Sequence, residues 1–277
     1  MQKSKSNNAG CALAVSIVLY RPDLVLLTRT LDTLNQALQN VSDTIERSEV
    51  FMIDHSPHRQ PDDILTDWYK LFGVRIKINY DYVGANPGFG AGHNRAFAHC
   101  NQWADYFLVA NPDLEFTPGS LAAGIDFLAA HVAVGLIAPA LIEPDGGLRP
   151  ACFRYPDVPT LLLRALGVDA AHPRIAAYEC RDWDPSVPKA DPPLISGCCM
   201  LFRASTYAQL GRFDPAYFLY FEDFDLSLRA GRLGLSAYCP DMRVRHFGGG
   251  VARKGWRHMA HFARSAARFF NIHGWHQ

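Results

Sequence analysis

The sequence predicts an α/β fold in which a mainly parallel central sheet is covered by helices on both faces. Two observations lead to this prediction: apolar runs alternate with helical patterns through the first half of the 277-residue chain, and polar or glycine-rich segments follow several of those runs. Strands that alternate with helices form parallel βαβ units, and ligands of such sheets bind beyond the carboxyl ends of the strands. The chain has 27 basic and 27 acidic residues, so its net charge gives no reason to expect a nucleic-acid partner.

The first half supplies the regular part of the predicted fold. Apolar runs predict five strands, at residues 13–20, 50–53, 74–79, 106–110 and 134–138. Helical patterns fall between them at residues 23–38, 62–71 and 119–130, and a further helix follows the glycine-rich loop 84–92 and runs to about residue 103. Asp23 is the expected N-cap of the first helix, in which leucines recur at helical spacing.

The second half is less regular. Residues 144–193 are rich in proline and charge, and we expect irregular loops there with one short helix at 161–166. Regular structure returns with a strand at 194–203, a helix at 223–230 and strands at 235–239 and 243–246. We therefore expect one domain over residues 1–250, with two halves at 1–140 and 141–250, followed by a C-terminal helix within 251–277.

Cysteine usage and hydropathy predict a cytoplasmic location. The seven cysteines are odd in number and include no C-x-x-C pair, so we expect no disulfide framework and a reducing cytosol. Residues 1–10 are polar and lack the apolar core of a secretory leader. The most apolar long stretch, 121–142, is interrupted by Asp126, His131 and Pro139, so it predicts a helix and a strand and not a membrane span.

A glycine-rich loop at residues 86–94 opens the third predicted helix. It is not a dinucleotide fingerprint, because His93 stands where the third glycine would fall and the loop follows the third strand instead of the first. No Gly-Lys-Ser/Thr follows, so it is not a P-loop either. We expect its glycines to let the backbone approach a ligand and the helix that follows to favour an anion. A plain turn with a helix cap is the alternative.

Asp113 and His246 are candidate ligand-binding residues at strand ends. Asp113 belongs to Asn111-Pro112-Asp113, directly after a predicted strand, and a divalent cation that bridges two phosphates needs only one or two carboxylates. A cap or turn residue is the simpler interpretation of a lone Asp. His246 ends a strand before a glycine run, which is a natural place for a ligand-binding group, although a single His is usually structural.

The run Glu222-Asp223-Phe224-Asp225 carries three acids among aromatic residues. A carboxylate set beside apolar rings has a raised pKa and can act as a general base. At helical spacing Glu222 and Asp225 share one side, while Asp223 points elsewhere. An acidic first turn that complements the helix dipole is the alternative.

Taken in order along the chain, these motifs resemble glycosyltransferase family 2, in its rhamnosyltransferase-like branch. The resemblance runs from about residue 13 to residue 250, and its most specific part lies at 211–229. The matching motifs are Val15-Ser16-Ile17-Val18, Asp54, Asn86-Pro87-Gly88-Phe89-Gly90-x-Gly92-x-Asn94, Asn111-Pro112-Asp113, Ser196-Gly197, Gly211-x-Phe213-Asp214, Glu222-Asp223-x-Asp225-Leu226 and His246.

The resemblance implies a GT-A fold, inversion at the anomeric carbon and roles for individual residues. Asp223 is the implied general base, with Glu222 as the runner-up, and Asp113 and His246 are the implied ligands of a divalent metal ion, Mg²⁺ or Mn²⁺. The implied donor-binding residues are Tyr20, Asp54, Asn86, Gly90, Asn94 and Asp113. Gly197 and Asp225 are assigned to the acceptor side, with Asp225 supporting the helix that presents the base. The sequence departs from the family pattern at Asn-Pro-Asp, where D-x-D is usual, and at His55, where Asn is expected.

The implied reaction is the transfer of a sugar from a nucleotide-sugar donor to a glycan or polyprenyl-linked glycan in cell-surface polysaccharide synthesis. dTDP-rhamnose is the favoured donor, and UDP-sugars stay open. Residues 1–140 would bind the nucleotide sugar, and residues 141–250 would supply the acceptor and catalytic half. A sugar-phosphate nucleotidyltransferase is one alternative, but a glycine-rich basic loop is missing at residues 20–23. An inactive nucleotide- or carbohydrate-binding module is the other, and the intact acidic run argues against it.

The C-terminal segment is basic and amphipathic. Residues 251–277 contain five Lys or Arg residues and no Asp or Glu. In a helix over 251–271 the apolar face would hold Trp256, Met259, Ala263, Ala266 and Phe270, and the basic face Lys254, Arg257, His261, Arg264 and Arg268. Such a helix can lie on an anionic membrane, here the inner face of the cytoplasmic membrane, or it can pack on the domain with its basic face in solvent.

Overall fold

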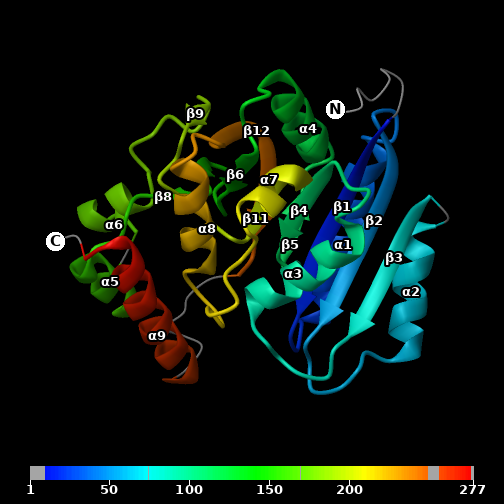
Figure 1. The fold of residues 1–277 in the computed structure, drawn as a ribbon, viewed down its shortest axis with the longest axis horizontal. Helices are drawn as coiled ribbons and strands as arrows, with labels where there is room; N and C mark the ends of the chain where they lie inside the picture. The colour runs from blue at the N-terminus through cyan, green and yellow to red at the C-terminus, as the bar shows by residue number, and fades with distance from the viewer. Residues whose placement is uncertain (1–9, 74, 169, 249–255, 276–277) are drawn as a thin grey trace.

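The structure is a computed structural model that describes residues 10–73, 75–168, 170–248 and 256–275 (Figure 1). A mixed sheet of ten strands runs through its centre. The strands are β1 (Cys11–Leu19), β2 (Ile45–Asp54), β3 (Ile76–Tyr82), β4 (Tyr106–Ala110), β5 (Leu114–Phe116), β6 (Leu136–Ile142), β7 (Leu148–Pro150), β9 (Lys189–Ala190), β11 (Cys199–Arg203) and β12 (Ser236–His246). Their order is β3-β2-β1-β4-β11-β6-β12-β5, with β7 beside β6 and β9 beside β12. A separate two-stranded sheet pairs β8 (Cys152–Phe153) with β10 (Leu194–Ile195).

Helices flank the sheet, as the sequence predicts. They are α1 (Leu24–Gln39), α2 (Asp62–Phe72), α3 (Phe89–Cys100), α4 (Ser120–Ala130), α5 (Val158–Ala165), α6 (Pro173–Tyr178), α7 (Ala204–Gln209), α8 (Glu222–Gly231) and α9 (Trp256–His273). The Asp23 carboxylate accepts the backbone N–H groups of Val25 and Leu26, which confirms it as the cap of α1. None of the described helices has the length and apolar character that a membrane crossing requires.

The α/β prediction is confirmed, and its parallel part applies chiefly to the first half. β3, β2, β1 and β4 pair in parallel, whereas β11 runs antiparallel to both of its neighbours, β4 and β6. The strand predicted at 194–203 is interrupted at residues 196–198, where the chain leaves β10 and enters β11. The two strands predicted at 235–239 and 243–246 are one strand, β12, with a bulge between Cys239 and Arg243.

Residues 144–193 are more ordered than predicted. They contain α5 and α6 as well as β7, β8 and β9. Asp157 caps α5 by accepting the N–H of Thr160, and Leu161 and Tyr178 are buried. The segment looked irregular because its proline and charge content hides short helices, whose stability comes from packing and not from length.

Two hydrophobic clusters form the core. The larger one fills the space between the central sheet and its helices. The second is largely aromatic and joins α5, α6, α8 and α9; its buried members are Phe153, Leu161, Tyr178, Leu194, Tyr217, Phe221, Phe224, Ala266, Phe269 and Phe270. The seven cysteines all lie in the described part of the chain, and none of them forms a disulfide bond.

The C-terminal helix packs on the domain, which is the second of its two anticipated arrangements. Ala266, Phe269 and Phe270 of α9 are buried in the aromatic cluster. Figure 1 shows α9 beside α5 and α6, next to α8. Residues 251–255, and with them Lys254 of the predicted basic face, lie outside the described residues, as does the side chain of Arg257.

Candidate active site

The carboxyl ends of three neighbouring parallel strands carry residues that the sequence singled out. β2, β1 and β4 are adjacent in the sheet and end at Asp54, Leu19 and Ala110. Tyr20 follows β1 and is half exposed, and the Asn111–Asp113 turn follows β4. Because these strands are parallel, the three ends share one edge of the sheet, where ligands of open α/β sheets bind.

Asp113 and His246 lie together although 133 positions separate them in the chain. His246 Nε2 is 3.2 Å from Asp113 Oδ1, and Asn111 Nδ2 is 3.3 Å from the same imidazole nitrogen. Antiparallel pairing of β12 with β5 sets this contact, because it places His246 opposite Leu114. A Cβ atom on Gly248 would come within 2.2 Å of Asp113 Oδ2, so only a glycine leaves room over the pair.

This pair fits a divalent cation. Two ligands at right angles in an octahedral shell, each with a bond of about 2.1 Å, stand about 3 Å apart, close to the observed separation. The described residues contain no group of three or more His, Cys, Asp or Glu side chains arranged for a metal ion. A cation held here would therefore take its remaining ligands from water and substrate oxygens, as Mg²⁺ does with phosphates.

Asp223 is held at the N-terminus of α8, facing the turn between β10 and β11. Its Oδ2 accepts the N–H of Gly197 at 2.7 Å, and its Oδ1 accepts the N–H of Phe224 at 2.9 Å. A Cβ on Gly197 would lie 2.9 Å from Asp223 Cβ, so this approach depends on glycine. Burial raises the pKa of Asp223 to about 6, against the opposing effect of the two N–H donors. The carboxylate is half-buried and mostly ionised at neutral pH, which are the properties of a general base.

Glu222 differs from its neighbour because it is buried. Its side chain is 4% exposed, and its Oε2 is a buried atom without a hydrogen-bond partner in the described structure. Burial first, and the charge of Asp223 second, raise the pKa of Glu222 well above its usual value. Glu222 therefore holds its proton more tightly than Asp223 does.

The turn at residues 196–198, between β10 and β11, connects Asp223 with the Asp113–His246 pair. The N–H of Asn111 donates to the carbonyl of Cys198, the residue after Gly197. Burial raises the pKa of the Cys198 thiol to about 11, and the charges of both Asp113 and Asp223 contribute in the same direction. The successive residues Gly197 and Cys198 thus contact Asp223 and Asn111, respectively, so the two parts of the candidate site are neighbours.

Two strained residues precede α8. Tyr220 and Phe221 have φ angles of 70° and 66°, in the left-handed region that residues with side chains rarely adopt. Such strain persists only where surrounding contacts enforce it, and it is concentrated at functional sites. Here it aims the first turn of α8, and with it Asp223, at Gly197.

The contacts that enforce this conformation come from α9. Its side chains reach the chain that leads to the base at successive points: Arg268 to Asp214 (2.7 Å), His261 stacked on Phe218 (4.5 Å between centroids), the Ser265 hydroxyl to the Leu219 carbonyl (2.8 Å), His258 to the Tyr220 hydroxyl (3.0 Å) and His273 to Asp225 (2.8 Å). The sequence prediction of a basic face and an apolar face missed this role. Both faces are used, because the histidines and Arg268 bind residues 214–225 while the aromatic residues fill the cluster beneath.

Asp225 does not face the open side of the site. Its Oδ2 pairs with Arg229 at 2.7 Å and its Oδ1 with His273 at 2.8 Å, and the residue is 4% exposed. Both oxygens are therefore engaged between α8 and α9. These contacts suit a residue that supports α8, and they engage both oxygens that an acceptor would need. The acceptor-side role of Asp225 stays a prediction.

The glycine-rich loop approaches protein where the sequence predicted a ligand. Cβ atoms on Gly88, Gly90 and Gly92 would come within 2.3 Å of the Phe218 carbonyl, 2.6 Å of Phe213 Cβ and 2.5 Å of a Val18 methyl, respectively. The glycines are needed because α3 packs tightly on β1 and on residues 213–218. Close packing therefore accounts for these glycines, and the donor role of Gly90 stays a prediction.

Asn94 and Asn86 also make internal contacts. Asn94 donates to the Phe213 carbonyl and accepts from Tyr207 and the Phe213 N–H, so its amide ties α3 to residues 207–213. These bonds give Asn94 a structural role, and its predicted contact with a donor stays a prediction. Asn86 accepts the N–H of Gly88 and is half-buried, so its amide nitrogen stays a candidate for a ligand.

Asp54 is fully buried at the end of β2. Its carboxylate accepts from the Ser56 N–H at 2.8 Å, the Tyr80 hydroxyl at 2.6 Å and the Gln60 amide at 3.2 Å. A direct contact with a nucleobase or ribose would have to displace Tyr80 or Gln60. Asp54 in this conformation fixes the loop after β2, and contact with the donor stays a prediction.

Two buried histidines behind the strand ends were not assigned a role from the sequence. His93 Nδ1 lies 2.7 Å from the Ser16 hydroxyl, and burial lowers the pKa of His93 to about 3. Burial also lowers the pKa of His55, which packs close to Gly92. Both imidazoles pack between β1, β2 and α3, and no sequence signal marked His93, which stands between Gly92 and Asn94.

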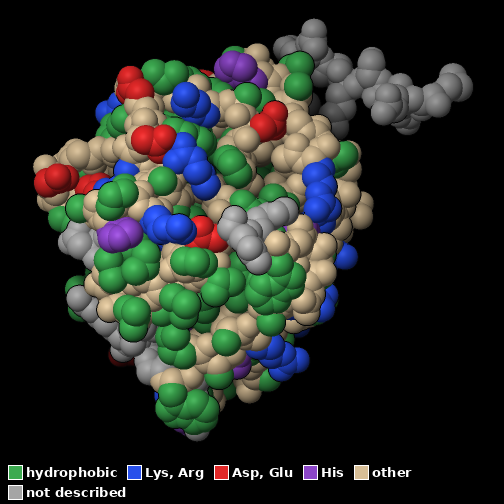
Figure 2. All heavy atoms as spheres, turned by 90° about the vertical axis from the view of Figure 1, so that its left-hand side faces the viewer, with side chains coloured by type: hydrophobic (Ala, Val, Ile, Leu, Met, Phe, Trp, Pro, Cys, Tyr) green, Lys and Arg blue, Asp and Glu red, His purple; other side chains and the backbone are tan. Residues whose placement is uncertain are grey.

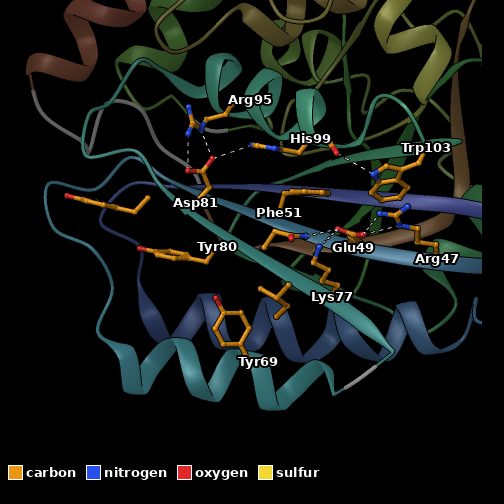
Figure 3. Close-up of a pocket in the computed structure, with 13 residues that line it drawn as sticks. Arg47, Glu49, Phe51, Tyr69, Lys77, Tyr80, Asp81, Arg95, His99 and Trp103 are labelled. Atoms are coloured by element: carbon orange, nitrogen blue, oxygen red, sulfur yellow. Dashed lines mark hydrogen bonds and ion pairs between the residues drawn. The ribbon is translucent and has the colours of Figure 1, made fainter.

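A cavity of about 650 Å³ opens away from these residues, over the edge of the sheet at β3 (Figure 3). Arg47 pairs with Glu49 and also lies 3.8 Å over the Trp103 ring, and Arg95 pairs with Asp81. Lys77 also pairs with Glu49, so both acids of the lining are paired and one positive charge is in excess. Neither Asp223 nor the Asp113–His246 pair lines it, so its size alone does not make it the active site.

Comparison with solved structures defines the class of fold. The chain matches GalNAc-T7 with UDP, GalNAc and Mn²⁺ (TM-score 0.62, 14% identity, 96% of this chain and 48% of that chain). It also matches the mannosyltransferase PcManGT of Pyrobaculum calidifontis in complex with GDP-Man and Mn²⁺ (TM-score 0.57, 16% identity, 94% and 65%) and S. aureus TarS (TM-score 0.55, 15% identity, 95% and 43%). The protein has the GT-A fold of glycosyltransferases.

A sequence relative is a rhamnosyltransferase. The chain is 35% identical over 183 residues to the N-acetylglucosaminyl-diphospho-decaprenol L-rhamnosyltransferase of Mycobacterium tuberculosis, across 59% of this chain and 57% of that protein. The match thus spans little more than half of the curated relative. No family model matches the chain. The predicted resemblance to rhamnosyltransferases is confirmed by this relative.

Proposed function

We propose that the protein is an inverting rhamnosyltransferase of glycosyltransferase family 2. It would transfer rhamnose from dTDP-rhamnose to a lipid-linked N-acetylglucosaminyl acceptor in the synthesis of a cell-surface polysaccharide. The observation that carries the proposal is the position of Asp223, a carboxylate with a pKa of about 6, in one site with the Asp113–His246 pair of a GT-A fold. The sugar and the acceptor come from the 35% identical relative.

The residues suit a single displacement at the anomeric carbon. The acceptor hydroxyl oxygen forms the new bond to C1 of the sugar while the bond from C1 to the diphosphate oxygen breaks. Asp223 takes the hydroxyl proton, and its two backbone N–H donors hold the carboxylate in place without neutralising it. Attack opposite the leaving group inverts the configuration.

Asp113 and His246 would hold a divalent cation, Mg²⁺ or Mn²⁺, whose charge stabilises the departing nucleoside diphosphate. Tyr20, Asn86 and the strand ends of residues 1–140 would bind the nucleotide sugar. Gly197 would border the acceptor, within the half at residues 141–250. A lipid-linked acceptor resides at a membrane surface, so the proposal includes peripheral contact with the inner face of the cytoplasmic membrane.

The donor and the stereochemistry can be tested together. Purified protein is incubated with Mg²⁺, a soluble N-acetylglucosaminyl diphosphate lipid with a short chain, and in turn dTDP-rhamnose, UDP-glucose, UDP-GlcNAc and GDP-mannose. We expect a product heavier by one deoxyhexose only with dTDP-rhamnose, and an anomeric configuration opposite to that of the donor by NMR. Product from another donor alone would overturn the assigned sugar, and retained configuration would overturn the assigned mechanism.

A further inference from the structure

A stripe of exposed apolar side chains runs along the outer side of α5. Val158, Leu162 and Leu166 follow one another at four-residue spacing and are 42%, 58% and 80% exposed. The inner side of the same helix buries Leu161 in the aromatic cluster. A helix that is apolar on both sides is normally covered on both sides, so the outer stripe calls for a partner that the described residues do not supply.

The end of α9 extends this stripe. Ile272 and Trp275 are 49% and 57% exposed, and Trp275 stacks on Phe270 with 4.8 Å between ring centroids. The Tyr155 hydroxyl donates to the Gly274 carbonyl at 2.6 Å, which fixes the end of α9 beside the start of α5. Figure 2 shows hydrophobic side chains gathered over the lower half of this face. We call Val158, Leu162, Leu166, Ile272 and Trp275 the apolar face.

The charges around the apolar face favour an anionic partner. Four acids of the neighbouring segments are paired with arginines: Asp157 with Arg174, Glu179 with Arg164 and Arg181, Asp182 with Arg154, and Asp214 with Arg268. Two further arginines, Arg232 at 3.1 Å from the His273 ring and the exposed Arg264 of α9, form no ion pair with the described residues. Exposed leucine and tryptophan beside arginines without an acidic partner is the pattern of surfaces that bind the interface of anionic membranes.

Resting on the proposed function, we infer that the apolar face seats the protein on an anionic lipid bilayer and so places the site over the lipid that carries the acceptor. The face and the base lie on opposite sides of one aromatic cluster: Leu161 of α5 packs in the cluster that also holds Phe224, the residue after Asp223. Docking by this face would thus bring a membrane close to the site without covering it. It also changes the surface expected from the sequence, since Ala266 and Phe270 of the predicted lipid-facing side are buried.

The test is vesicle co-sedimentation of the full chain. Vesicles of phosphatidylglycerol and phosphatidylcholine are compared with vesicles of phosphatidylcholine alone, for the wild type, for the double variant Leu162→Asp/Leu166→Asp and for Val132→Asp. Val132 is 83% exposed and follows α4, so it controls for adding a charge at an exposed apolar position. We expect the wild type and Val132→Asp to bind anionic vesicles alike, and the double variant to bind at least ten-fold more weakly with an unchanged circular dichroism spectrum.

Failure of this inference and failure of the proposed function are distinguishable. On a short-chain, water-soluble acceptor the double variant should transfer sugar at the wild-type rate, and on a long-chain acceptor in vesicles it should be at least ten-fold slower. No turnover by the wild type on either acceptor, with vesicle binding as predicted, would overturn the function and leave the surface standing. Equal vesicle binding by all three proteins would overturn the surface, as would sedimentation equilibrium that shows a wild-type dimer and a monomeric double variant.

Discussion

The parallel half of the sheet and the segment at residues 214–225 are held by different kinds of contact. The strands β1 to β4 are joined by regular backbone ladders, and their polar residues reach one edge because the strands are parallel. The 214–225 segment has two residues in the left-handed region and is fixed by side chains of a helix some 40 positions further along the chain. The two halves of the site should therefore respond differently to mutation: changes at the strand ends should weaken ligand binding, and changes at α9 should slow turnover.

The largest effect is expected at Asp223. Asp223→Asn keeps the shape of the side chain and removes its ability to accept a proton, so kcat should fall by ~10²–10⁴-fold. Binding of dTDP by isothermal titration should be unchanged, because nucleotide binding is assigned to the other half. Glu222→Gln is the matched control and should retain most of the activity. The reverse pattern, with Glu222→Gln inactive and Asp223→Asn active, would move the base to Glu222.

The next effect separates the metal from the base. With excess EDTA the activity should disappear and return on addition of Mg²⁺ or Mn²⁺. His246→Ala should raise the metal concentration for half-maximal activity by at least ~10-fold, by analogy with the loss of groups that support a metal ligand. Activity that is unchanged in EDTA would refute the metal role of Asp113 and His246.

A smaller effect tests the contacts of α9. Arg268→Ala removes the ion pair with Asp214, and His273→Ala removes the contact with Asp225. We expect each to lower kcat by about 3–10-fold with an unchanged KM for the donor. The effect of His273→Ala should be the larger, because loss of a buried hydrogen-bonded partner costs about 1–3 kcal/mol, whereas the Arg268–Asp214 pair is partly exposed and worth less. Arg264→Ala, exposed on the same helix, is the control, and Arg268→Lys should restore part of the rate. Equal kcat in all four variants would show that α9 only packs.

The smallest effect concerns stability. Glu222 has a raised pKa, so the native state binds the proton of this carboxyl group more tightly than the unfolded state does. The stability that this proton binding contributes is lost as the pH rises. Glu222→Gln keeps the neutral form at every pH. Its melting temperature relative to the wild type should therefore increase from pH 5 to pH 8, by about 2–4 °C for each kcal/mol relieved. A constant difference across that range would contradict the raised pKa.

Features that depend on local sequence could be predicted, and features that depend on tertiary contacts could not. The alternation of strands and helices and the Asp23 cap follow from local patterns, whereas the meeting of Asp113 with His246 was implied by the family resemblance, and the structure contains all three. The packing of Gly88 and Gly90 against residues 213–218 could not be predicted, because a glycine that approaches a ligand and one that approaches another segment leave the same sequence pattern.

The role of α9 was hidden for a similar reason. An amphipathic pattern shows that one face is apolar, but not which surface covers it. The histidines of its basic face bind residues 214–225 through single contacts that depend on the tertiary structure. Likewise, the two engaged oxygens of Asp225 and the burial of Glu222 separate three acids that are alike in sequence.

The proposed mechanism depends most on Asp223, which acts as a base because burial raises its pKa to about 6. The direct test is the pH dependence of kcat/KM between pH 4.5 and 8.5, which reports the groups of the free enzyme. Since only the ionised carboxylate accepts the proton, kcat/KM should rise with pH through a single step near pH 6 and level off above it, and the step should be absent from the residual activity of Asp223→Asn. A wild-type profile that is flat across this range, or a step that persists in Asp223→Asn, would contradict the assignment.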